Sequence, residues 1–82
     1  MDLKGELLLN KSRIHTTQLG VGRIKNNLHL STDDVVDYCI NIIEEKDSAV
    51  TKKGKNYYVR LENIEITINA SSFTIITAHL KK

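Results

Sequence analysis

The sequence contains no proline and only four glycines. Proline and glycine dominate flexible linkers and turns, so their scarcity argues against a linker between separate domains. A chain of 82 residues supplies one domain of ordinary size. We therefore expect a single α+β domain over residues 1–82, with a helical half at 1–46 and an antiparallel sheet at 48–80.

A disulfide framework is also missing, because Cys39 is the only cysteine. This is typical of a reducing compartment. No apolar run approaches the roughly 20 residues that span a bilayer. The apolar run Leu7–Leu9 is too short for a signal peptide and follows the wrong charge pattern. We expect a cytoplasmic protein without a membrane partner.

The sequence also has no large excess of either positive or negative charge. The formal net charge is +2, with 40% hydrophobic and 27% charged residues. This balance is typical of a globular chain rather than a disordered one. A surface for a polyanion would therefore have to arise from local clustering of basic residues.

The first half of the chain has the apolar spacing of three helices. Thr16 or Thr17 can cap the second helix, and Ser31–Asp34 has the form of a capping box before the third. Gly20 and Gly22 either weaken the second helix or permit a close backbone approach. The apolar stripes consist of Leu3, Leu7 and Leu8, then Val21, Ile24 and Leu28 flanked by Leu19, and then Val35, Val36, Cys39, Ile40, Ile42 and Ile43.

From Ser48 onward the apolar period changes to two, which predicts strands. The short connections favour sequential antiparallel pairing into a four-stranded meander. One face is rich in isoleucine and must be covered by the helices. The predicted strands are Ala49–Lys52, Tyr57–Leu61, Ile64–Asn69 and Phe73–Leu80.

The last of these strands contains the doublet Ile75-Ile76, which is apolar on both faces. The doublet predicts a central position in the sheet or cover on both sides. Strict alternation would place Thr77 and His79 on one face together with Ile75.

Four residues are candidates for catalysis. The imidazole group titrates near neutral pH, so His15 and His79 could serve as base and acid in RNA cleavage. Arg23 could hold a phosphate, and Thr77 could orient His79 or contact the same phosphate. Alternatively, His15 caps a helix or bonds a backbone carbonyl, His79 is a surface residue, and Arg23 pairs with Asp33, Asp34 or Asp37.

The histidines lack the paired spacing of a zinc site, so we expect no metal and no cofactor.

Basic residues gather around the first predicted hairpin. Alternating cationic and aromatic side chains can neutralise phosphates and stack on bases. Lysines at a sheet edge also guard against aggregation, which is the alternative interpretation. The candidate nucleic-acid-binding residues are Lys52, Lys53, Lys55, Tyr58 and Arg60.

Ile14–Leu28 with Asp33–Cys39, and Gly54–Val59 with Ile66–His79, resemble a family of short bacterial proteins, common in Firmicutes, whose function is unknown. This resemblance covers nearly the whole chain and implies no activity.

More distantly, the layout is similar to the barnase–colicin–RelE group of small ribonucleases and toxins. The run Thr74-Ile-Ile-Thr-Ala78 matches their final strand, and His15, Arg23, Thr74 and Thr77, with His79 just beyond, fall at matching positions. That resemblance implies metal-independent RNA cleavage. The chain departs from the group in its near-neutral charge and in having no obvious catalytic glutamate.

Two functions are compatible with these patterns. One is an RNA-directed, toxin-like nuclease. The other is a non-catalytic module that holds a protein partner through a sheet edge, or a second copy through the meander. The sequence leaves open whether the protein is an enzyme.

Overall fold

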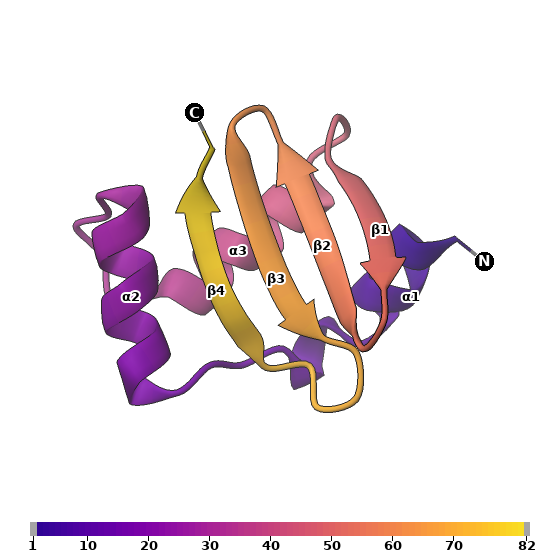
Figure 1. Ribbon diagram of the computed structural model, residues 1–82, viewed down its shortest axis with the longest axis horizontal. Helices are drawn as coiled ribbons and strands as arrows, with labels where there is room; N and C mark the ends of the chain where they lie inside the picture. Colours follow the sequence, from indigo (N-terminus) through magenta and orange to yellow (C-terminus); the bar gives the residue numbers. More distant parts are fainter. Residues whose placement is uncertain (1, 82) are drawn as a thin grey trace.

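A computed structural model describes residues 2–81 and confirms the predicted α+β class. The four strands form one antiparallel sheet in the order β1-β2-β3-β4. Figure 1 views the sheet from its uncovered face, with α3 behind the strands and α2 beside β4. The elements are α1 (Leu3–Leu9), η1 (Lys11–Arg13), α2 (Gln18–Leu28), α3 (Val35–Glu44), β1 (Ala49–Lys53), β2 (Asn56–Leu61), β3 (Ile64–Asn69) and β4 (Ile75–Leu80).

Side-chain caps begin all three α-helices. The Asp2 carboxylate accepts from the Gly5 amide at 2.7 Å, and the Thr17 hydroxyl accepts from Gly20 at 3.0 Å. Asp34 caps α3 by accepting from the amide of Asp37. These bonds satisfy amides that have no partner within the helix. The predicted cap of the second helix is confirmed, with Thr17 rather than Thr16 as the cap. The predicted capping box of the third helix is wrong, because Asp34 itself is the cap and its amide donates to Thr32 rather than to Ser31.

The core lies between the helices and the isoleucine face of the sheet, as predicted. Burying each large aliphatic side chain contributes about 1.5–3 kcal/mol. Burial also raises the pKa of the Cys39 thiol to about 12, which keeps it protonated and unreactive. Leu19 lies outside the core at 79% exposure. The largest fully buried side chains are Leu7, Ile24, Ile43, Ile66, Ile68, Ile75, Val35, Val59 and Cys39.

The predicted central position of the last strand is wrong, because β4 is an edge strand. The register shifts between Thr67 and Ile68, so that Thr67 faces Thr77 while Ile68 faces Ile75. Ile76 is the extra residue of this bulge and is 41% exposed, whereas Ile75 is 1% exposed. The bulge places Ile75 on the covered face, away from Thr77. The apolar doublet therefore marks a β-bulge rather than two covered faces.

The outer edge of β4 is closed by the segment before α2 and by α2 itself. The His15 amide donates to the Phe73 carbonyl at 3.2 Å, and the Ile75 amide donates to the His15 carbonyl at 2.7 Å. The Thr16 hydroxyl donates to the Ile75 carbonyl at 2.9 Å, and the Asn27 amide donates to the Ala78 carbonyl at 3.2 Å. Such contacts protect an edge strand from pairing with other chains.

Gly20 and Gly22 have different roles in α2. A Cβ on Gly20 would lie 2.1 Å from the Thr16 hydroxyl oxygen, whereas a Cβ on Gly22 would meet no atom within 4 Å. The close backbone approach considered from the sequence is therefore required at Gly20. At Gly22, glycine only weakens the helix.

We expect Gly22→Ala to raise the free energy of unfolding by about 0.5–1 kcal/mol, because alanine favours a helix. Gly20→Ala should leave the protein less stable than Gly22→Ala by at least about 1 kcal/mol, because the new methyl displaces the Thr16 hydroxyl from the Ile75 carbonyl. Urea denaturation measures both. Equal stabilisation by the two alanines would contradict the close approach.

Candidate nucleic-acid interface on the open sheet face

Two rows of side chains cross the face of the sheet that the helices leave uncovered. We call this surface the open face. Strand alternation places its residues opposite the buried Val59 and Ile66. The strand register aligns the first row as Thr51, Tyr58, Thr67 and Thr77, and the second as Ala49, Arg60, Glu65 and His79.

Glu65 is the electrostatic centre of the open face. Its carboxylate accepts from Arg60 Nε at 2.8 Å and lies 3.2 Å from Lys81 Nζ. His79 Nε2 lies 3.7 Å from the other carboxylate oxygen. The Glu65 side chain is 13% exposed, and the Arg60 hydrogen bond, assisted by Lys81, lowers the pKa of Glu65. One anion thus fixes cations from two strands in place.

A hollow of about 390 Å³ lies over these two rows. Its charged groups are Lys53, Arg60, Lys81 and Glu65, so one carboxylate balances one of the cations and two positive charges remain unbalanced. Thr51 and Tyr58 complete the lining. The hollow is therefore polar and cationic, and it contains one aromatic ring.

The structure brings together three of the five predicted nucleic-acid-binding residues. Lys53, Tyr58 and Arg60 line the hollow, and Lys55 lies in the adjoining turn. Lys52 belongs to the opposite side of β1, where its ammonium lies 5.6 Å from the centroid of the Tyr57 ring.

Sequence reasoning missed Thr51, Glu65 and Lys81. Arg60 and Glu65 lie at equal distances from the predicted Glu62–Asn63 turn, so aligning the hairpin about that turn would have paired them.

The four predicted catalytic residues do not form one hydrogen-bonded cluster among residues 2–81. Thr77 and His79 belong to the open face, but His15 pairs with Thr74 at the start of β4. The five residue steps from Thr74 to His79 span about 16 Å of extended chain. Arg23 is exposed on α2. Its expected pairing with Asp33 is instead made by Lys25, at 2.5 Å. A catalytic role for these residues remains a prediction.

The His15 side chain makes two hydrogen bonds, one within the helical half and one to the residue before β4. Its Nδ1 lies 2.7 Å from the Arg13 carbonyl, and its Nε2 lies 3.1 Å from the Thr74 hydroxyl. A carbonyl only accepts, so Nδ1 donates to Arg13. In the neutral imidazole, Nε2 then accepts from the Thr74 hydroxyl. The expectation that His15 bonds a backbone carbonyl is confirmed.

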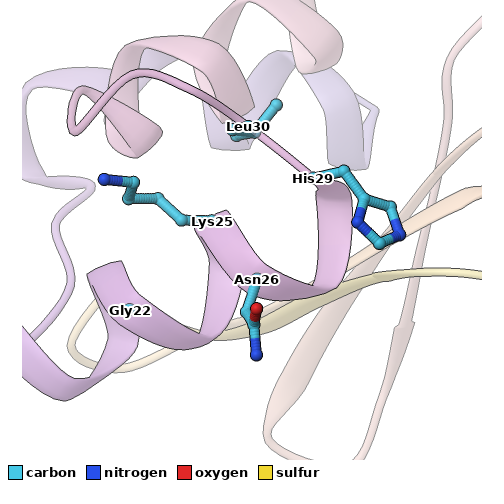
Figure 2. Close-up of a pocket in the computed structure, with 5 residues that line it drawn as sticks. All are labelled: Gly22, Lys25, Asn26, His29 and Leu30. Atoms are coloured by element: carbon cyan, nitrogen blue, oxygen red, sulfur yellow. The ribbon is translucent and has the colours of Figure 1, made fainter.

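A second hollow, of about 410 Å³, lies at the end of α2 and is lined by Gly22, Lys25, Asn26, His29 and Leu30. Figure 2 shows that the side chains of Lys25, Asn26 and His29 point in different directions. Lys25 is also engaged by Asp33. This hollow lacks the convergent polar groups of a binding site.

A family model described as protein of unknown function (DUF3781) matches residues 8–79. The chain belongs to this DUF3781 family. No curated protein and no solved structure matched the chain. DUF3781 membership confirms the resemblance to a family of unknown function, while bacterial origin and the relation to small ribonucleases remain predictions.

Two further properties bear on the site. Within residues 2–81, no three His, Cys, Asp or Glu side chains are grouped so that they could hold a metal ion. No helix in the described part of the chain is long and apolar enough to cross a membrane.

The lowered pKa of Glu65 predicts how stability depends on pH. A carboxylate with a depressed folded-state pKa stabilises the fold fully above its unfolded value, here 4.5, and loses this contribution as pH falls through the lower folded-state value. We expect Glu65→Gln to reduce the loss of unfolding free energy that the wild type shows as the pH falls below about 4.5. Urea denaturation across the acid range measures this decline. Glu44→Gln is the control, because its exposed pair with Lys11 contributes little. A decline that is unchanged in Glu65→Gln would contradict the role of the carboxylate.

Proposed function

We propose that this protein is an RNA-binding module that holds a single-stranded segment on its open face. The observation that carries this proposal is a hollow lined by three cations, Lys53 of β1, Arg60 of β2 and Lys81 after β4, next to the Tyr58 ring. Arg60 and Lys81 also contact the Glu65 carboxylate. Single-stranded nucleic acids are held by cations that track the phosphates and by aromatic rings that stack on bases.

Each group of the hollow suits a different part of such a ligand. Arg60 is 59% exposed although Glu65 holds its Nε, so its remaining donors can reach a phosphate. Lys53 is exposed and offers a mobile point charge. Tyr58 is half-buried, which limits the entropy that its ring would lose on stacking. Hydroxyls such as that of Thr51 can contact phosphate or sugar.

Three properties of the site support binding more strongly than cleavage. The contacts that lower the pKa of Glu65 weaken it as a general base near neutral pH. His79 lies directly against this carboxylate at 3.7 Å, which leaves no room for a scissile phosphate between a base and an acid. His15, the other predicted partner of His79, pairs with Thr74 just before β4, whereas His79 lies near the other end of that strand. We therefore propose a non-catalytic role.

Lys53→Ala should weaken binding of a fluorescent single-stranded RNA and reduce its dependence on salt. With three cations against phosphates, the logarithm of the binding constant should fall with the logarithm of salt concentration at a slope of about −2, and Lys53→Ala should bring this slope to about −1.4. Fluorescence anisotropy at several salt concentrations measures both slopes.

The matched control is Lys46→Ala, which removes the same charge from an exposed position between α3 and β1. It should leave the slope unchanged. Absence of RNA binding at low salt, or equal effects of the two substitutions, would refute the proposed surface. Gel analysis of the recovered RNA should show an uncut strand, and cleavage that His79→Ala abolishes would instead favour the nuclease interpretation.

A further inference from the structure

A groove with an apolar floor and an acidic rim lies between α3 and the β2–β3 turn. Its volume is about 480 Å³. The floor includes Ile42, which is 6% exposed, and the partly buried Leu61 and Ile64. The rim carries the exposed carboxylates of Glu45, Asp47 and Glu62, and Tyr38 and Asn41 complete the lining.

Unlike Asp33, Glu44 and Glu65, the three rim carboxylates make no ion pair among residues 2–81, which is also true of Asp2, Glu6, Asp34 and Asp37. Asp33 contacts Lys25, Glu44 contacts Lys11, and Glu65 contacts Arg60, Lys81 and His79. Within residues 2–81, no Lys, Arg or His nitrogen lies within 4.0 Å of the carboxylates of Glu45, Asp47 or Glu62. The groove therefore presents three carboxylates without ion pairs beside partly buried apolar side chains, while the ammonium of Lys4 is engaged by the backbone carbonyls of Glu45 and Ser48.

The same chain carries three exposed lysines at the opposite end of β2. Lys52, Lys53 and Lys55 surround the tight turn at Gly54, and we call this segment the lysine hairpin. The β1–β2 turn and the β2–β3 turn lie at opposite ends of the sheet in Figure 1. One molecule thus presents a cationic tip at one end and an acidic groove at the other.

We propose that the acidic groove binds the lysine hairpin of a second copy of this chain, head to tail. The three lysines match the three carboxylates in number. The methylene stems of lysine can lie along the apolar floor while the ammonium groups reach the rim. Because the two surfaces differ, the contact is heterologous and extends into short chains or closes into a ring. Because the contact involves one turn and one groove and rests on exposed charges, we expect weak, salt-sensitive association.

Glu62 allows this proposal to be separated from effects on folding. Its φ is +56° in a tight turn, a conformation that glycine adopts without strain. Glu62→Gly should therefore raise the midpoint of urea denaturation while removing one rim carboxylate. We expect its self-dissociation constant to rise about two- to five-fold. Unchanged association in this stabilised variant would overturn the rim contact.

Sedimentation velocity over about 10 µM to 1 mM protein, at low and high salt, provides the direct test. The wild type should gain average mass with concentration at low salt and lose this gain at high salt. Two reversed-charge variants should each stay monomeric, and their mixture should associate. The variants are Lys52→Glu/Lys53→Glu/Lys55→Glu and Glu45→Lys/Asp47→Lys/Glu62→Lys.

The matched control reverses three cations away from both surfaces, so that its net charge equals that of the hairpin variant: Lys11→Glu/Arg23→Glu/Lys25→Glu. Because its hairpin and groove are intact, it should associate on its own as the wild type does, whereas the hairpin variant stays monomeric. A wild type that is monomeric at every concentration would overturn the proposal, as would a control that stays monomeric like the hairpin variant. Circular dichroism establishes that each variant is folded. The outcome does not depend on RNA binding, which Lys53→Ala tests separately.

Discussion

Two backbone hydrogen bonds join His15 to the start of β4, from His15 to Phe73 and from Ile75 to His15. This short parallel contact lies between Ile14, which is buried, and Thr17, which caps α2. The connection between the first two helices is therefore fixed on the sheet edge, and α2 must run alongside β4. Its buried residues Ile24 and Leu28 then join the core on the isoleucine face. The opposite face is left without a helix.

That one-sided cover gives the strands two separate roles. Alternate residues such as Val59 and Ile66 supply the core, while Tyr58, Arg60 and Glu65 between them remain available to a ligand. A cluster of cations on so small a surface repels itself unless an anion lies among them. Glu65 supplies this anion and is nearly enclosed by its partners. The surface keeps a positive excess and a defined arrangement. It is therefore better suited to binding a phosphate-bearing ligand than to proton transfer.

Much of the fold could be predicted from local patterns. The period-two alternation of Ile64, Ile66 and Ile68 identified β3, and the hydroxyls of Thr16 and Thr17 narrowed the start of α2 to two positions, of which Thr17 is the cap. The edge position of β4 could not be predicted, because a β-bulge exposes Ile76 and an apolar doublet looks the same in a bulge and in a covered strand.

The open face was only partly predictable. Lys53, Tyr58 and Arg60 follow from their spacing, but Glu65 and Lys81 join them only through the register of the sheet. The distance between His15 and His79 likewise depends on where the connection docks. Side-chain type and spacing thus identify candidate residues, whereas long-range pairing decides which of them meet.

The central claim is that the open face is the RNA-binding surface. Nuclear magnetic resonance of isotopically labelled protein, titrated with a single-stranded oligouridine, tests it most directly. The account predicts that the largest chemical-shift changes occur at Lys53, Tyr58, Arg60, Glu65 and Lys81, with little change along α3. Changes confined to the helices, or no change at millimolar RNA, would contradict it.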